Sequence, residues 1–362
     1  MQKIYLSGLI ASLLFGCATS GTDVTASNSV AVNPMTANPA KAMPIALNAH
    51  TLSLTAKLDV NKAPNENFDL SNWKINLPME DDKPDRAGKV MEISKEQLNE
   101  KPFSHPDWFY TDAKTGAMVF VTPNKAMTTP NSKNARSELR AMLAESYNDP
   151  ANNFTIASTA NASEYGSIGG QLAATLSVDW VSTSGSDEKT GAFSTVIGQI
   201  HGSDNEPLKI VYRKLPGHEH GSLTWNYEIN ASKASGNYKH RTDIRTNVFG
   251  HYKLLNTDSD PIDGIKLGEV FSYDVNIVGD IMNLTFKKNI GEANEVVKTF
   301  SMNLAAGKYQ GQEYDEGYAN DYMYFKAGNY NQCNVGSSKC TNNGFSAGDY
   351  AQVSFYQLDL NQ

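Results

Sequence analysis

The sequence is poor in three features: basic runs, helical periodicity and cysteine. Its formal net charge is −8 and it contains no basic run, which argues against general affinity for nucleic acid. Helical periodicity is scarce, and one modest helix is expected near Ile93 to Glu100. The three cysteines cannot all pair with one another. Glycine and tyrosine are abundant, with 27 and 17 residues, and this composition favours strands and turns over a helical bundle.

The first residues are typical of a short export signal. Lys3 precedes an apolar stretch from Leu9 to Phe15 that is too short to span a bilayer as a helix. The stretch that ends at Cys17 resembles a bacterial lipobox, so we expect removal of residues 1–16 and lipidation of Cys17, which anchors the protein stably. Ala18, where an Asp would retain a lipoprotein in the inner membrane, indicates the outer membrane, on its periplasmic side or at the cell surface. The alternative is an ordinary signal peptide in which Cys17 is incidental.

The next segment, residues 17–67, is expected to be a flexible tether. It contains no Phe, Tyr or Trp and few charges, so it buries too little apolar area to offset its ordering entropy. Aromatic residues and strand-like alternation return at Phe68. We therefore expect residues 68–362 to form one folded domain.

Short alternating runs bounded by Gly, Asn, Asp and Pro recur through this domain. Examples are Ala117 to Val121, Gln171 to Val178 and Val353 to Leu358. Many short strands without intervening helices predict an all-β, antiparallel sandwich or jelly roll rather than an alternating helix and strand fold.

Three of the expected strands gather polar side chains on one face. Residues two apart project to the same side of a strand. The three faces carry Arg136, Glu138 and Arg140, then Gln199 and His201, then Tyr324, Lys326, Tyr330 and Gln332. Gly328 leaves a gap in the third face where a ligand or a neighbouring backbone can approach closely. Each face alone is also explained by solvent exposure or structural pairing, but together they predict a basic groove on an acidic protein.

In this order, the segments Arg136 to Arg140, Gln199 to His201 and Tyr324 to Gln332 resemble the three signature blocks of polysaccharide lyase family 7, the alginate lyases. The opening from Phe68 to Pro78 resembles the start of that domain. The resemblance implies a β-jelly roll whose concave sheet forms an alginate-binding groove. Asn329 departs from the family, which often has a small aliphatic residue there, and its side chain is expected to face away from the groove.

The resemblance also implies roles for individual residues. The catalytic residues would be Arg136, Gln199, His201 and Tyr330. The substrate-binding or supporting residues would be Glu138, Arg140, Tyr324, Lys326 and Gln332. The implied partner is alginate or a related polyuronate, and we expect a monomer that uses no metal or organic cofactor, binds no nucleic acid and meets the membrane only through its lipid.

A lyase of this kind removes the C5 proton of a uronate and expels the 4-O-linked sugar. Arg136 and Gln199 can bond the carboxylate as negative charge develops beside it. His201 suits the role of base. Tyr330 can protonate the leaving oxygen, and cations such as Arg140 or Lys326 favour its phenolate. In this family, Ile rather than Val at the position of Ile200 accompanies guluronate acceptance, while endolytic and exolytic action both stay open.

Rival functions fit the sequence less well. A glycoside hydrolase needs two carboxylates that flank the bond, whereas Glu138 lies between two arginines that keep it ionised. A carbohydrate-binding module would show exposed aromatics without convergent His, Tyr and Arg. The Gly-x-Ser-x-Gly pattern around Ser346 is expected to be a turn, because a strand-like run follows it and no later His exists. The His218 to His220 cluster is expected to be a solvated loop rather than a metal site.

The three cysteines divide into one expected lipid-attachment site and two that can pair. With Cys17 assigned to lipid attachment, two cysteines remain in an exported protein, where disulfides persist. Cys333 follows Gln332 directly and Cys340 lies seven residues further on. We expect a disulfide that fixes the end of the third polar strand, with free thiols as the alternative.

Overall fold

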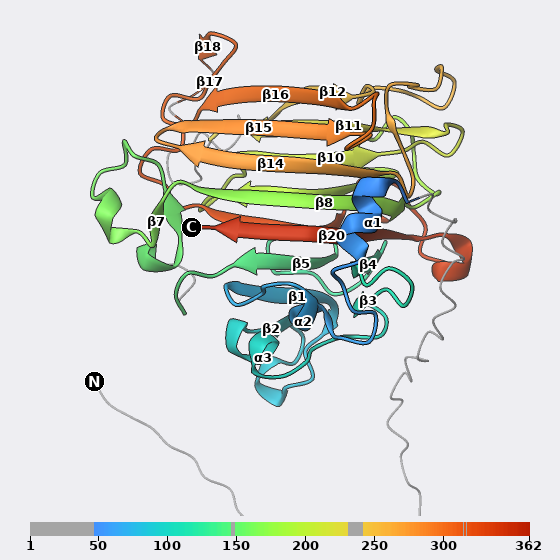
Figure 1. Cartoon of the computed structure of the whole chain (residues 1–362), viewed down its shortest axis with the longest axis horizontal. Coiled ribbons are helices and arrows are strands. Elements are labelled where there is room, and N and C mark those ends of the chain that lie inside the picture. The colour runs from blue at the N-terminus through green and yellow to red at the C-terminus, as the bar shows by residue number, and fades with distance from the viewer. Residues whose placement is uncertain (1–46, 146–148, 231–241, 314, 316) are drawn as a thin grey trace, which may run out of the picture. The chain divides into compact units, whose positions relative to one another are not determined.

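The computed structural model describes residues 47–145, 149–230, 242–313, 315 and 317–362. Strands dominate these residues and form two large antiparallel sheets (Figure 1), which confirms the expected all-β sandwich of the jelly-roll type. The expected signal peptide and Cys17 lie outside the described residues. Within the described residues, none of the helices has both the length and the apolar character needed to cross a membrane.

The first sheet carries the three polar segments. Its order is β12-β11-β10-β9-β19-β5-β1-β2, with β13 paired to β11. Its strands are β1 (Trp73–Glu80), β2 (Val90–Ile93), β5 (Arg136–Ala141), β9 (Ser194–His201), β10 (Leu208–Arg213), β11 (His220–Glu228), β12 (Asp243–Phe249), β13 (Ile265–Lys266) and β19 (Tyr324–Asn331).

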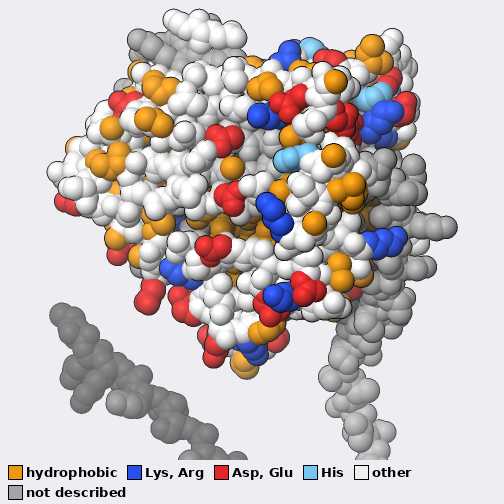
Figure 2. Space-filling model, viewed as in Figure 1, with side chains coloured by type: hydrophobic (Ala, Val, Ile, Leu, Met, Phe, Trp, Pro, Cys, Tyr) orange, Lys and Arg blue, Asp and Glu red, His pale blue; other side chains and the backbone are white. Residues whose placement is uncertain are grey.

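The second sheet packs against the first, lies nearer the viewer in Figure 1, and has the order β18-β17-β16-β15-β14-β8-β20-β4-β3. Its face in Figure 2 shows acidic and basic side chains interspersed among neutral ones. Its strands are β3 (Phe109–Thr111), β4 (Met118–Pro123), β8 (Gly170–Trp180), β14 (Val270–Val278), β15 (Ile281–Lys288), β16 (Val296–Asn303), β17 (Lys308–Tyr309), β18 (Gln312–Glu313) and β20 (Tyr350–Asn361). A separate parallel pair joins β6 (Phe154–Thr155) to β7 (Ser167–Ile168).

The three runs expected to be strands are confirmed as parts of β4, β8 and β20. One large hydrophobic core fills the space between the sheets and includes Trp73, Trp225 and Phe120, each almost completely buried. The expected helix is confirmed as α3 (Lys95–Glu100). Ser94 caps its first turn, since the Ser94 hydroxyl accepts from the Gln97 amide and the Gln97 side chain accepts from the Ser94 amide.

The expected tether is wrong over its described part, residues 47–67. This part forms α1 (Ala49–Thr55) and α2 (Pro64–Asn67), and α1 lies against β20 (Figure 1). Leu54 is buried with Ala117, Val270 and Tyr356. The absence of aromatic residues was therefore a misleading criterion, because aliphatic side chains supply the apolar contact. The folded domain accordingly includes residues that precede Phe68.

Four short 3₁₀ helices complete the described elements. They are η1 (Pro84–Arg86), η2 (Pro150–Asn152), η3 (Ala162–Glu164) and η5 (Phe345–Ala347). The last contains Ser346 and leads directly into β20, so this segment is a turn before the final strand and lacks the helix that a nucleophile elbow requires.

Candidate active site

The three polar segments lie on adjacent strands of the first sheet, in the order β9-β19-β5. Tyr324 is opposite His201 in the ladder, and Lys326 lies between Arg140 on one side and Gln199 on the other. Strand alternation turns these side chains to one face of the sheet. The expectation that three separate segments form one surface is confirmed.

Gly328 allows two backbones to approach closely within this surface. Its φ is +138°, and a β-carbon at this position would lie 2.7 Å from the carbonyl oxygen of Ser137 on β5. The register against β9 also shifts between Ala327 and Tyr330. The gap expected at Gly328 therefore accommodates the neighbouring strand, one of the two possibilities that the sequence offered.

A cavity of about 550 Å³ opens over the surface. Six of the nine site side chains expected from the sequence line it, namely Arg136, Arg140, His201, Tyr324, Lys326 and Tyr330. Its wall also contains Lys74, Asn76, Glu92, residues 129–132, Ser203, Asp204, Glu206 and Tyr322.

Glu138 lies beneath the cavity rather than on its surface. Its side chain is 1% exposed and forms ion pairs with Arg136, at 3.1 Å, and with Lys326. The amide of Gln199 donates to the same carboxylate. Glu138 therefore supports the residues above it, and its burial is inconsistent with direct contact to a substrate. Gln199 is likewise directed at Glu138, and its Oε1 is buried without a partner among the described residues.

Three cations of the cavity, Lys74, Arg136 and Lys326, are paired with acids, which corrects the expectation of a basic groove. Lys74 lies 2.5 Å from Glu92, while Arg136 and Lys326 share Glu138. A buried cation needs a counterion because desolvation penalises an isolated charge. Burial and the nearby charge of Arg136 together lower the pKa of Lys326 to about 8, while Glu138 opposes the change. Burial likewise lowers the pKa of Lys74 to about 7, against the opposing charge of Glu92.

His201 is held in one orientation at the end of β9. Its Nδ1 lies 2.5 Å from the carbonyl oxygen of Gly202, so the neutral ring carries its proton on Nδ1 and leaves Nε2 as the basic nitrogen. The ring stacks on Tyr324, with centroids 5.1 Å apart. Burial lowers the pKa of His201 to about 4, with contributions from Lys326 and Arg136. The ring is therefore neutral near pH 7 and able to accept a proton.

Tyr330 lies near two cations and a hydroxyl group. The guanidinium carbon of Arg136 is 3.9 Å from the centre of its ring, and Lys326 Nζ is 5.9 Å from that centre. The Tyr330 hydroxyl hydrogen-bonds to Ser132 Oγ at 3.0 Å. Arg140, expected as another neighbouring cation, instead lies 3.9 Å over the ring of Tyr324.

Sequence reasoning missed several residues of the cavity wall. Lys74 and Asn76 alternate with apolar residues on β1, the same signal that identified the three polar strands, and could have been found. Ser132 and Glu206 lie outside strands, in connections that alternation does not describe. Only the folded structure brings these two side chains to Tyr330 and His201.

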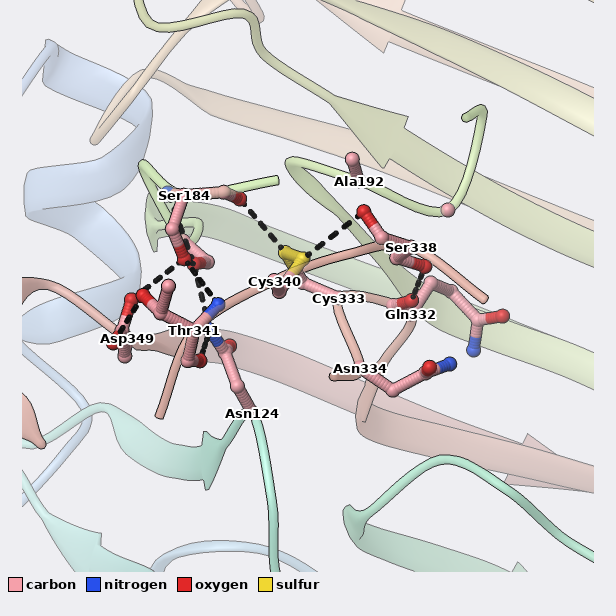
Figure 3. Close-up of a disulfide and its surroundings, with 12 residues drawn as sticks. Asn124, Ser184, Ala192, Gln332, Cys333, Asn334, Ser338, Cys340, Thr341 and Asp349 are labelled. Atoms are coloured by element: carbon pink, nitrogen blue, oxygen red, sulfur yellow. Dashed lines mark hydrogen bonds between the residues drawn. A yellow bond between two sulfur atoms is a disulfide. The ribbon is translucent and has the colours of Figure 1, made fainter. Parts of the chain in front are cut away.

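Gln332 does not line this cavity. Its Oε1 accepts from Asn134 Nδ2 at 3.0 Å, and it borders a second, smaller cavity over β9 to β12. The disulfide expected after it is confirmed between Cys333 and Cys340 (Figure 3). Within the closed loop, the hydroxyl of Ser338 donates to the carbonyl of Gln332 at 2.7 Å. The bridge thus secures the end of β19 beside the cavity.

The cluster from His218 to His220 is more structured than the solvated loop expected. His218 is buried, Glu219 pairs with Lys266, and His220 Nδ1 lies 2.5 Å from Asp260 Oδ2. The ligand atoms of Glu219, His220 and Asp260 lie within 4.8 Å of one another. Each of these groups already has a protein partner, so the cluster is explained by pairing at the start of β11.

A β-sandwich with a histidine, a tyrosine and an arginine converging on one sheet face is the arrangement that the resemblance to a polysaccharide lyase implies. The family model described as alginate lyase matches residues 68–362. The chain belongs to the alginate lyase family, polysaccharide lyase family 7.

Relatives in sequence and structure agree with this assignment. An alginate lyase of Klebsiella pneumoniae is 33% identical over 305 residues, which cover 82% of this chain and 90% of that protein. A crystal structure of the alginate lyase from Klebsiella pneumoniae has a TM-score of 0.66 at 31% identity, covering 82% of this chain and 98% of that one. An exolytic family 7 alginate lyase from Zobellia galactanivorans has a TM-score of 0.64 at 31% identity, covering 83% and 98%.

Proposed function

We propose that this chain cleaves alginate by β-elimination, with His201 as the base and Tyr330 as the acid. The observation that carries the proposal is the convergence of His201, Tyr330 and Arg136 on one cavity from three adjacent strands. Family membership supports the reaction class, and the neutral His201 ring supports the assignment of the base.

In the proposed step, Nε2 of His201 takes the C5 proton of a uronate. The electron pair of the C5–H bond forms the C4–C5 double bond as the C4–O4 bond breaks. The departing oxygen takes the hydroxyl proton of Tyr330, so the products are an unsaturated uronate end and a new hydroxyl end. Return of the proton from His201 to the Tyr330 phenolate restores the enzyme. Arg136 offsets the negative charge that develops at the substrate carboxylate.

We propose guluronate-containing blocks as the preferred substrate. In guluronate the C5 proton and the leaving oxygen lie on opposite sides of the sugar, which suits a separate base and acid. Ile200 lies between Gln199 and His201, where the family resemblance associates Ile with guluronate acceptance. Faster cleavage of polyguluronate than of polymannuronate supports this preference, and the reverse order contradicts it.

The activity test follows the rise in ultraviolet absorbance when purified protein is mixed with alginate. We expect His201→Asn and Tyr330→Phe to reduce turnover at least about 100-fold. Tyr165→Phe is the matched control, because Tyr165 lies on another part of the chain and does not line the cavity. Near-normal turnover in either site variant would overturn the assigned roles. The sizes of products over time distinguish endolytic from exolytic cleavage.

We also propose that lipid on Cys17 anchors the mature, monomeric protein to the outer membrane. The apolar stretch before Gly16-Cys17 and the Ala18 that follows support this placement. The wild-type protein should sediment with outer membranes and enter solution with detergent. Cys17→Ala should abolish the lipid mass and release the protein from membranes. A soluble wild-type protein that is cleaved elsewhere would contradict the anchor.

A further inference from the structure

Glu206, in the connection between β9 and β10, contacts both His201 and a half-buried lysine, Lys209. Its Oε1 lies 3.4 Å from Nε2 of His201, the nitrogen that faces away from Gly202. Its Oε2 lies 3.6 Å from Nζ of Lys209. Sequence reasoning gave Glu206 no role, and its position against the basic nitrogen of His201 requires an explanation.

Two hydrogen bonds to Glu228 fix the backbone of Glu206, and Lys209 lies next to its carboxylate. The Glu206 amide donates to Glu228 Oε2 at 3.0 Å, and the Glu206 carbonyl accepts from the Glu228 amide at 3.1 Å. Lys209 is held in turn by Asp243, at 2.7 Å, and by Glu228, at 3.6 Å. A lysine this close to Glu206 favours its ionised form. Glu206 is therefore a fixed negative charge beside His201.

The remaining charges around His201 oppose its protonation. Lys326 and Arg136 are cations on the neighbouring strands, and both disfavour a positive imidazole ring. Burial acts in the same direction, whereas Glu206 is the carboxylate that favours the protonated ring. The titratable and charged groups of the surrounding elements are Arg136, Glu138 and Arg140 on β5, Tyr324 and Lys326 on β19, Lys209 on β10, Asp321 and Tyr322 before β19, and Asp204 and Glu206 in the β9–β10 connection.

We infer that Glu206 is a positioning residue that acts as the counterion of His201 when the ring accepts the C5 proton. In the resting enzyme the neutral ring bonds to Gly202 through Nδ1 and presents Nε2. When Nε2 takes the proton, the ring becomes a cation with Glu206 already at ion-pair distance. Because this pairing forms only as charge develops, it stabilises the transition state more than the bound substrate. The inference rests on the proposed function and adds to it a carboxylate that acts through His201.

The test compares Glu206→Gln with Glu206→Asp and with the control Asp260→Asn. Glu206→Gln keeps the size of the side chain and removes its charge, so we expect kcat to fall about 10-fold or more while KM changes less than about twofold. The acid limb of kcat/KM should also move to lower pH, because the protonated ring has lost its counterion. Glu206→Asp should recover part of kcat and of the acid limb.

The control variant Asp260→Asn removes a carboxylate that pairs with a histidine, His220, outside the cavity, so kcat and the acid limb should stay near those of the wild type. A purely structural role for Glu206 would reduce kcat without moving the acid limb. An unchanged kcat or an unmoved acid limb in Glu206→Gln would overturn the inference.

A second measurement needs no substrate. In protein labelled in the histidine rings, the His201 signals are identified by their loss in His201→Asn and followed by NMR as the pH is lowered. Protonation should begin at lower pH in Glu206→Gln than in the wild type. If the enzyme proves inactive on every alginate, the proposed function fails, and this titration still decides whether Glu206 is the counterion. An unmoved titration contradicts the counterion role whatever the activity.

Discussion

The guanidinium group of Arg136 lies over the ring of Tyr330, with its central carbon 3.9 Å from the ring centre. The same group is paired with Glu138 at 3.1 Å, so its position is fixed from below. When the leaving oxygen takes the hydroxyl proton, Tyr330 gains negative charge directly beneath a delocalised cation. Arg136 is therefore suited to act on the acid as well as on the substrate carboxylate.

We predict that Arg136→Lys lowers kcat by about 100-fold although the positive charge is retained. A lysine ammonium group is a point charge that cannot both cover the Tyr330 ring and hold Glu138 as a planar guanidinium does. Steady-state kinetics on alginate measure the effect. Arg86→Lys is the control, because Arg86 pairs with Asp81 away from the cavity, and its kcat should match the wild type. A kcat within about twofold of wild type in Arg136→Lys would contradict this role.

The pKa values of two cavity residues predict a bell-shaped dependence of kcat/KM on pH. His201 acts as a base only when neutral, and its pKa is lowered to about 4, so activity is lost as the pH falls through about 4. Lys326 has its pKa lowered to about 8, so it loses its charge as the pH rises through about 8. The cavity then has one cation fewer above the Glu138 carboxylate. This loss of positive charge disfavours binding of an anionic substrate.

A lysine variant separates the two limbs of this profile. Lys326→Met should lower kcat/KM below pH 8 and flatten the alkaline limb, while the acid limb remains. Lys287→Met on β15 removes a solvent-exposed lysine of the other sheet and should leave the whole profile unchanged. An alkaline limb that persists unaltered in Lys326→Met would assign it to another group.

Whether a site residue can be predicted from the sequence depends on the element that carries it. Arg136, His201 and Tyr330 lie on strands, where a period of two fixes which side chains share a face. Ser132 and Glu206 reach the same cavity from connections, whose path depends on the whole fold. The pairing of Lys326 with Glu138 was also beyond the sequence, because it depends on the order of β19 and β5 in the sheet. The missed helix α1 shows a different limit, since Leu54 becomes an anchoring residue only once Ala117 and Val270 form a surface for it.

Asn329 is the departure from the family pattern that the structure explains. As expected, its side chain faces away from the groove, and it is completely buried between the sheets. Its Nδ2 donates to the carbonyls of Phe120, at 3.1 Å, and of Ala351, at 2.7 Å, and its Oδ1 accepts from Thr195 Oγ1 at 2.7 Å. One side chain thereby joins β19 and β9 of one sheet to β4 and β20 of the other.

We predict that Asn329→Ala lowers the free energy of unfolding by about 2–3 kcal/mol, because the hydroxyl of Thr195 and two backbone carbonyls lose a partner in the core. Urea titration followed by tryptophan fluorescence measures the change. The control is Asn283→Ala on β15, where the half-buried side chain bonds to Ser301 near the surface, and a change below about 0.5 kcal/mol is expected. Equal effects of the two variants would show that the inter-sheet bonds of Asn329 contribute little.

A series of hydrogen bonds links the disulfide loop to Tyr330 at the cavity. Cys333 and Cys340 are seven positions apart and close a short loop (Figure 3). Within this loop, the side-chain amide of Asn334 donates to Asn134 Oδ1. The backbone amide of Asn134 donates to Ser132 Oγ at 3.1 Å, and the Ser132 hydroxyl hydrogen-bonds to the hydroxyl of Tyr330. Opening the disulfide loop should therefore loosen the segment that holds the acid.

We predict that Cys333→Ser combined with Cys340→Ser lowers the free energy of unfolding by about 2–3 kcal/mol, the chain-entropy value for so short a loop. It should also lower kcat by a few fold, because Ser132 is no longer held firmly against Tyr330. Thermal unfolding and steady-state kinetics measure the two effects. Because both sulfur atoms are held in the disulfide, neither should react with an alkylating agent until reductant is added, even in denaturant. An unfolding midpoint equal to that of the wild type would contradict the stabilising role, and a reduced stability with unchanged kcat would contradict the connection to Tyr330.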